Sequence, residues 1–174
     1  VKLEEFMGGD SAVIRNARRC WKSEDRSNEK SDRNLIRHLI RKEHKTPFEA
    51  MVFTFDIKAP IFVARQWMRH RIGSFNEESL RYCVAEESYY IPPSLEQLDV
   101  FNWINLPQAM FDMYNDLVSK GLPKEQARAI LPVGTYTRFY WTVNGSSLMN
   151  FLRLRLDKAA QYEIRQYAQI VLEL

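Results

Sequence analysis

The sequence predicts an α+β fold in which helices flank an antiparallel sheet. Residues 50–57 and 135–143 show the alternation and the aromatic and β-branched side chains of strands, and they lie far apart in the chain. Most other segments carry apolar residues at helical spacing, and no strand–helix–strand unit repeats. Helices combined with strands that are not adjacent in sequence are typical of α+β proteins.

The composition is that of one folded domain. A chain of 174 residues with 45% hydrophobic and 27% charged residues can bury a core without disulfides. No apolar run approaches the ~20 residues of a membrane span, and we expect no signal peptide. We expect a single cytoplasmic domain over residues 1–174 with no membrane partner. Because the chain begins at Val1 and stops within a helical pattern at Leu174, we also expect trimmed termini.

Charge and cysteine content exclude several classes of protein. Lys+Arg 25 against Asp+Glu 22 gives a net charge of +3, which is too small to indicate a nucleic-acid binder. Cys20 and Cys83 supply neither a disulfide framework nor a CxxC zinc motif, and this usage is typical of an intracellular protein. His38 and His44 do not fall on one helical face, so we expect no metal site.

Two helices and a strand are predicted in the first third of the chain. Residues 11–20 and 31–43 have apolar side chains at helical spacing, and a polar loop at 21–29 joins them. Thr46-Pro47 ends the second helix, and residues 50–57 alternate as a half-buried strand. The apolar residues are Val13, Ile14 and Ala17, then Leu35, Ile36, Leu39 and Ile40, then Met51, Phe53, Phe55 and Ile57.

The rest of the chain is predicted to be mostly helical. Pro60 fits the first turn of a helix, and Gly121 fits the position after a helix end. The predicted elements are a helix at residues 61–69, an extended segment or loop at 74–82, helices at 107–120 and 123–131, a strand at 135–143, and helices at 145–154 and 158–173.

Polar chemistry is concentrated between Gln66 and Tyr82. Arginine presents a planar fork of donors that matches phosphate oxygens two at a time, and each such bond contributes about 1.5–3 kcal/mol. Asn76 and Glu77 add acceptors for a ribose hydroxyl or a base edge. The mixture indicates a nucleotide site, although a solvated loop with ion pairs explains the composition equally well. The residues are Arg69, His70, Arg71, Ser74, Asn76, Glu77, Ser79, Arg81 and Tyr82.

The run RHRIGSFNEESLRY at residues 69–82 meets every fixed position of the pattern RHRxxSxNExSxRY. It resembles the signature of the flavin-dependent thymidylate synthases. Flanking segments are similar to that family too, so the resemblance extends over nearly the whole chain. These segments are HKTPFE at residues 44–49, APIFVARQW at 59–67, YTRFYWTVN at 136–144, SLMNF at 147–151, Leu154-Arg155, Ala160-Gln161 and Glu163-Ile164-Arg165.

The resemblance implies an activity and an assembly. Members of that family methylate dUMP to dTMP with 5,10-methylenetetrahydrofolate as carbon donor, and they take electrons from NADPH through bound FAD. It also implies a homotetramer of α+β subunits with active sites shared between subunits.

Site residues follow from the resemblance by position, with Arg155 as the catalytic residue that polarises the uracil ring. His44 and Tyr82 correspond to residues near the flavin, folate and NADPH. The implied FAD contacts are Thr46, Arg69, His70, Arg71, Glu77, Asn144, Ser146 and Asn150. The implied dUMP contacts are Gln66, Arg69, Glu77, Glu78, Ser79, Leu80, Arg81, Arg128 and Arg155.

The chain also departs from the family. Cys20 and Ser146 stand where relatives often have a serine and an arginine, so we expect the flavin pocket to differ in detail. Ser79 has no predicted base beside it and is not expected to attack the substrate. Cys83 follows the signature at a variable position, and we interpret it as a packing residue.

Two alternatives stay open on the sequence alone. Basic and aromatic residues interleave from Arg65 to Phe75, as in modules that bind single-stranded nucleic acid. A catalytically inactive relative that still forms tetramers is the second alternative, and the intact signature argues against it.

Overall fold

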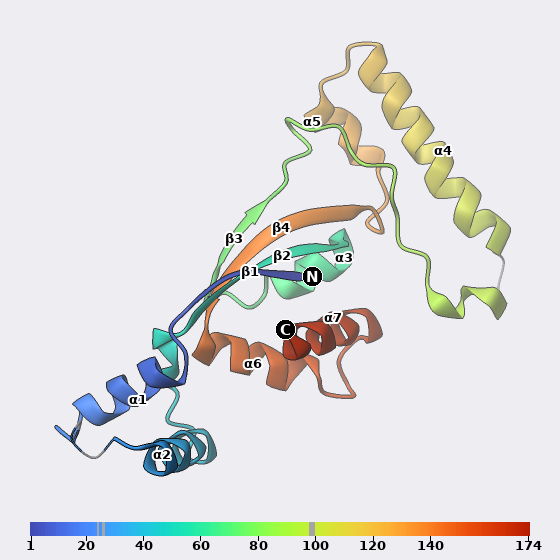
Figure 1. Cartoon of the computed structure of the whole chain (residues 1–174). Helices are drawn as coiled ribbons and strands as arrows, with labels where there is room; N and C mark the ends of the chain where they lie inside the picture. Colours follow the sequence, from blue (N-terminus) through green and yellow to red (C-terminus); the bar gives the residue numbers. More distant parts are fainter. Residues whose placement is uncertain (24, 26, 98–99) are drawn as a thin grey trace. The chain divides into compact units, whose positions relative to one another are not determined.

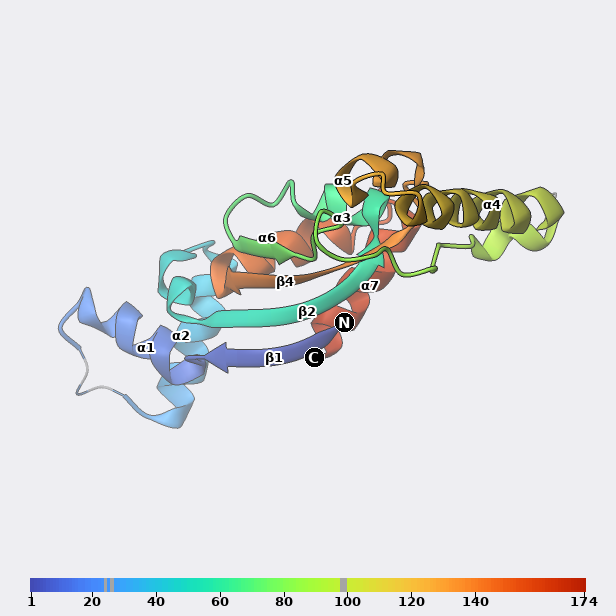
Figure 2. The ribbon, with the colours of Figure 1, turned by 90° about the horizontal axis from the view of Figure 1, so that it is seen from above.

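A four-stranded antiparallel sheet with helices forms the fold of the computed structural model, which describes residues 1–23, 25, 27–97 and 100–174 (Figure 1). The strand order is β1-β2-β4-β3, and the view from above shows β1, β2 and β4 side by side (Figure 2). The predicted α+β class is therefore confirmed. The strands are β1 Lys2–Met7, β2 Val52–Pro60, β3 Ser74–Glu77 and β4 Tyr136–Asn144.

The described residues group into two compact units. Unit 1 comprises Val1–Ile57, Arg69–Phe75 and Tyr140–Leu174, and unit 2 comprises Lys58–Met68 and Asn76–Phe139. Strands β2, β3 and β4 each contribute residues to both units. The single-domain assignment stays a prediction.

Unit 1 contains an apolar cluster between its first two helices and the short helix that follows them. Val13, Ala17, Leu39 and Phe48 are buried together there. A second group is aromatic, because Trp141 of β4 is fully buried and packs on Phe55 and Phe151, and this group supports the later helices. The helices of unit 1 are α1 Asp10–Arg19, α2 Glu29–Arg41, η2 Thr46–Ala50, α6 Gly145–Arg155 and α7 Tyr162–Glu173.

Unit 2 has its own core around one long helix. Phe111 and Tyr114 are fully buried and pack with Ala85 and Ala127. The Tyr114 hydroxyl accepts a hydrogen bond from the Ala85 main-chain nitrogen at 3.3 Å, so the polar atom of this buried side chain has a hydrogen-bond partner. The helices of unit 2 are α3 Ile61–Trp67, η3 Pro93–Gln97, α4 Val100–Ser119, α5 Lys124–Ala127 and η4 Arg128–Ile130.

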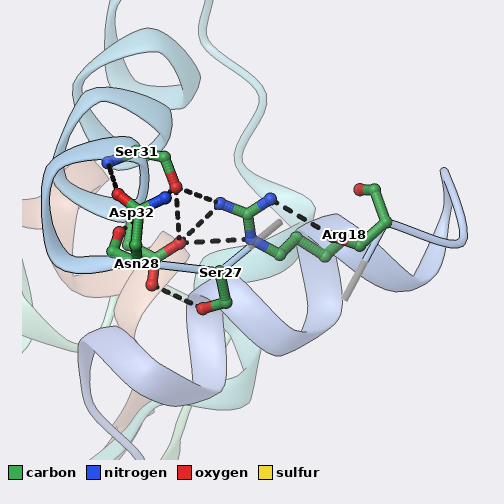
Figure 3. A network of polar contacts seen from close by, with 6 residues as sticks. Arg18, Ser27, Asn28, Ser31 and Asp32 are labelled. Carbon is green, nitrogen blue, oxygen red and sulfur yellow. Dashed lines mark hydrogen bonds and ion pairs between the residues drawn. The ribbon is translucent and has the colours of Figure 1, made fainter. Parts of the chain in front are cut away.

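A buried arginine joins α1 to α2 (Figure 3). Arg18 is only 7% exposed, and its guanidinium donates to the Ser31 hydroxyl at 2.8 Å and forms an ion pair with Asp32. The Ser27 hydroxyl donates to the other oxygen of Asp32 at 2.6 Å, and these hydrogen bonds, with Ser27 as the larger cause, lower the pKa of Asp32. Asn28 caps α2 by accepting from the main-chain nitrogen of Ser31 at 3.0 Å.

Most predicted elements are confirmed, with shifted ends, and two predictions are wrong. Helix α4 begins before Pro107, which lies in its interior, so the proline is not the start of the helix. Ile40 of α2 is 53% exposed, and only Leu39 of the predicted apolar stripe is fully buried. Strand β1 was not predicted. Its side chains are almost all exposed, and pairing with β2 across a bulge defines it.

None of the helices in the described part of the chain is long and apolar enough to cross a membrane.

Phe111→Ala should destabilise the protein by about 3–5 kcal/mol, because it leaves a cavity in the core of unit 2. Met113→Ala on the same helix is the matched control. Met113 is 57% exposed, so its loss should cost less than ~0.5 kcal/mol. Chemical denaturation measures both, and equal costs would contradict the assigned core.

Candidate functional site

A cavity of about 410 Å³ in unit 1 brings six of the predicted site residues together. They come from the 69–75 segment and from helix α6, which are far apart in the chain but lie in the same unit. The six are Arg69, His70, Arg71, Ser146, Asn150 and Arg155, and the other lining residues are Lys45, Ile72, Ser147 and Leu154.

Helix α6 supplies half of this lining from one face. Asn144 is its N-cap and accepts from the main-chain nitrogen of Ser147 at 2.8 Å, which fixes where the helix begins. The lining positions then recur every three or four residues, as expected for one side of a helix. The first turn of α6, with its partial positive charge, therefore lies at the cavity wall.

The charge of the cavity is positive. Lys45, Arg69, Arg71 and Arg155 line it, and no carboxylate of a described residue does. Within the same described ranges, none of the three arginines forms an ion pair, so their charge is not offset by the chain. Partial burial lowers the pKa of Arg155. Four cations with uncompensated charge make this cavity suited to an anionic ligand.

His70 and Arg155 contact each other inside the cavity. The Nε of Arg155 donates to Nε2 of His70 at 2.9 Å, which requires a neutral imidazole with its proton on Nδ1. Burial first, and then the charge of Arg155, lower the pKa of His70 and favour that neutral form. The imidazole also packs edge-on against Phe151, with 5.0 Å between ring centres.

Three other predicted residues of unit 1 do not line this cavity. Asn144 uses its side-chain oxygen for the α6 cap, and Thr46 is exposed at the start of η2. His44 is exposed, with 6.4 Å between its ring centre and that of His38. Among the residues that the structure describes, no three His, Cys, Asp or Glu side chains are grouped so that they could hold a metal ion.

Unit 2 holds the remaining predicted residues, and several meet around α5. Arg81 pairs with the Glu125 carboxylate at 3.0 Å, and Arg128 donates to the main-chain oxygen of Glu125 at 3.3 Å. Lys124 donates to the main-chain oxygen of Tyr82 at 3.0 Å, while the Tyr82 side chain is 71% exposed. The charge of Arg81 is thus partly offset, unlike that of the arginines in unit 1.

The other unit 2 residues lie on α3, β3 and the turn that follows β3. Gln66 is in the last turn of α3, and Glu77 accepts from the Thr137 hydroxyl at 2.8 Å. The main-chain N–H of Glu78 donates a hydrogen bond to the main-chain oxygen of Arg138 at 2.9 Å. The Ser79 main-chain oxygen accepts from two following nitrogens, and Leu80 packs against the unit 2 core, so these two residues also have structural roles.

Comparison with known proteins identifies the family. The family model described as "Thymidylate synthase complementing protein" matches residues 2–174. The flavin-dependent thymidylate synthase of Thermotoga neapolitana is 45% identical over 182 aligned residues, covering 100% of this chain and 84% of that protein. The flavin-dependent thymidylate synthase of Thermosipho africanus is 46% identical over 187 aligned residues, which cover 97% of this chain and 82% of that protein. The chain belongs to the flavin-dependent thymidylate synthase family.

A solved structure of a family-like enzyme agrees in fold. The crystal structure of the UMP/dUMP methylase PolB from Streptomyces cacaoi, bound with 5-Br dUMP, superposes with a TM-score of 0.92. It is 33% identical and covers 98% of this chain and 86% of its own. The resemblance of residues 69–82 to flavin-dependent thymidylate synthases is confirmed, and the nucleic-acid-binding alternative gains no support.

Sequence reasoning missed four residues that line the cavity of this flavin-dependent thymidylate synthase: Lys45, Ile72, Ser147 and Leu154. The helical spacing from Ser146 through Asn150 could have indicated Ser147 and Leu154. The interpretation of Cys83 as a packing residue is wrong, because the residue is exposed where the turn after β3 ends. Cys20 is exposed as well.

Gly73→Ala should weaken FAD binding about 10-fold or more. A Cβ at position 73 would lie 2.9 Å from Nε1 of Trp141 and 3.1 Å from the Thr142 oxygen. Trp141 is fully buried and cannot move aside, so the 69–75 segment must shift, and small displacements of positioned groups are costly.

Flavin fluorescence titration measures this change. Gly134→Ala is the control, because the nearest atom to its new Cβ lies at 3.9 Å. Unchanged FAD affinity in Gly73→Ala would show that the segment tolerates the shift.

Proposed function

We propose that the protein catalyses reductive methylation of dUMP to dTMP, with 5,10-methylenetetrahydrofolate as carbon donor and NADPH as reductant through bound FAD. The observation that carries the proposal is the cavity lined by four cations and by no carboxylate of a described residue, to which the signature contributes residues 69–72 and helix α6 contributes half of the lining. Family membership along residues 2–174 supports the same reaction. So does a structural neighbour solved with 5-Br dUMP.

The residues of the cavity fit FAD. Its diphosphate carries negative charge, and Arg69, Arg71 and Lys45 supply cations beside the first turn of α6. Ser146 and Asn150 add neutral polar groups, of which the Asn150 side-chain oxygen already accepts from Arg153 at 3.1 Å. We assign the FAD contacts to this cavity, with Thr46, His70, Glu77 and Asn144 as the further contacts implied by the family. FAD, when bound, supplies hydride chemistry that side chains cannot perform.

Arg155 is the residue that we place on the uracil ring. Uracil is a weak carbon nucleophile, and negative charge on its carbonyl oxygens and ring nitrogen makes the reacting carbon more electron-rich. A fixed guanidinium beside those atoms stabilises this charge without reorganising at the moment of reaction. Arg155 suits this role, because its partial burial strengthens electrostatic interactions and no carboxylate of the described residues lines its cavity.

Most of the proposed dUMP contacts belong to unit 2, whereas Arg69 and Arg155 belong to unit 1. Arginine forks match the phosphate, and the carboxylate of Glu77 accepts from a ribose hydroxyl. Ser79 donates to the nucleotide and is not a nucleophile. The exposed rings of His44 and Tyr82 provide faces for the planar rings of folate or NADPH. The proposed dUMP contacts are Gln66, Arg69, Glu77, Glu78, Ser79, Leu80, Arg81, Arg128 and Arg155.

Arg155→Ala should lower the turnover of dUMP to dTMP by about 100-fold or more, which is the usual cost of losing one fixed electrostatic contact. The assay contains FAD, NADPH and the folate donor. Arg37→Ala, an exposed arginine on α2, is the control and should retain full activity. Equal rates for Arg155→Ala and the parent would remove Arg155 from its role, and a parent without turnover would refute the function.

A homotetramer with shared active sites, in the cytoplasm, completes the proposal. Large apolar side chains are exposed in each unit, among them Ile170 and Leu172 on α7 and Leu106 on α4, and such surfaces favour association.

Sedimentation equilibrium should therefore give a particle of four times 20.6 kDa, and specific activity should fall on dilution below the dissociation range. A fully active monomer would contradict shared sites.

A further inference from the structure

We propose that His70 is a positioning residue that holds Arg155 through a neutral imidazole, so that Arg155 meets its ligand with its two terminal nitrogens. The proposal rests on the proposed function only where it names dUMP as that ligand. The family resemblance implies His70 as an FAD contact, and the hydrogen bond to Arg155 gives it a different role.

The hydrogen bond decides which edge of the guanidinium is available. Arginine can bind a planar ligand side-on, through Nε and one terminal nitrogen, or end-on, through both terminal nitrogens. His70 already accepts from Nε of Arg155 at 2.9 Å, so the side-on edge is occupied. The residues that the structure describes make no hydrogen bond or ion pair with either terminal nitrogen. Arg155 is therefore set for end-on recognition.

The imidazole is held in place by the same helix that carries the arginine. Phe151 and Arg155 are four residues apart on α6 and so lie on one face. His70 packs edge-on against the Phe151 ring at 5.0 Å while it accepts from Arg155. Phe151 is fully buried, with its ring centre 4.9 Å from that of Trp141. The buried rings of Phe151 and Trp141 therefore hold the imidazole of His70 in place.

The charges around His70 keep it an acceptor. The ionisable groups that line its cavity are Lys45 before η2, Arg69 and Arg71 on its own segment, and Arg155 on α6, and all are cations. Protonation would add a fifth positive charge and would convert Nε2 from an acceptor to a donor facing Arg155. Burial and the charge of Arg155 lower the pKa of His70, so the contact should break at a lower pH than it would with an ordinary histidine.

Two substitutions at position 70 separate the loss of the acceptor for Arg155 from the loss of the imidazole ring. In His70→Gln the amide oxygen reaches the place of Nε2, whereas in His70→Asn it reaches only the place of Nδ1. The Arg155 Nε–H signal in ¹⁵N NMR of the ligand-free full chain, assigned by its loss in Arg155→Lys, reports the contact directly. We expect slow exchange of this proton in the parent and His70→Gln, and exchange at least about 10-fold faster in His70→Asn.

The pH dependence gives a second readout. The protection of the Arg155 Nε–H against exchange, relative to the intrinsic exchange rate at the same pH, should fall in the parent as the pH drops below the histidine range, because His70 then gains a proton. His70→Gln has no such group and should lose this acid-dependent step. His38→Asn on α2, an exposed histidine outside the cavity, is the control and should behave as the parent.

Kinetics test the consequence for dUMP. His70→Asn should lower kcat/KM for dUMP about 10-fold relative to His70→Gln, because both variants lose the imidazole and only the glutamine keeps an acceptor at the place of Nε2. If His70 acts through Arg155, then His70→Asn should add almost nothing in the Arg155→Ala background. A contact of His70 with FAD alone predicts additive losses instead, and that result would overturn the proposal.

An unchanged Arg155 Nε–H in His70→Asn would also overturn it. Because the NMR measurements need no ligand, a failure of the proposed reaction in the parent would appear separately, as absent turnover beside an intact hydrogen bond.

Discussion

The concentration of positive charge without compensating carboxylates is the constraint on which the rest of unit 1 depends. Lys45, Arg69, Arg71 and Arg155 line one cavity and repel one another in the absence of an anion. Such a cluster persists only where the backbone that carries it is fixed by other interactions. The aromatic core supplies these interactions, since Trp141 packs on Phe55 and Phe151 and leaves room beside it only for a residue without Cβ at Gly73. Binding energy and folding energy therefore oppose each other in this segment, as is common at functional sites.

The two groups of arginines differ in how the chain treats their charge. Arg81 has a carboxylate partner in Glu125, with both side chains about half exposed, so solvent screens the pair and it contributes little to stability. Arg18 is buried and has a full set of acceptors in Ser31 and Asp32, which makes it a structural link between α1 and α2. The arginines of the cavity have neither arrangement. This contrast separates ligand-binding cations from structural ones more sharply than their abundance in the sequence does.

The sequence predicted the elements whose signals are local. The alternation at residues 135–143 predicted a strand there, and Phe139, Trp141 and Val143, at alternate positions of β4, are all buried. Strand β1 could not be predicted in this way, because it is an exposed edge defined by pairing with a distant strand. The start of α4 was wrong because Pro107 is also compatible with a first helical turn, and only the surrounding structure distinguishes the two positions. Within the site, the signature and the flanking family segments identified the arginines, but Lys45 joins them only through the tertiary fold.

Helix α6 explains why residues from distant parts of the chain can act on one ligand. Its cap at Asn144 fixes its start, Phe151 anchors it in the core, and Arg155 extends from the same face as Phe151 one turn later. His70 contacts both Phe151 and Arg155, so it couples the packing of the helix to the orientation of the guanidinium. A histidine serves this purpose better than a carboxylate would, since a carboxylate would neutralise the charge that we propose Arg155 brings to the uracil ring. A neutral acceptor orients Arg155 and leaves that charge intact.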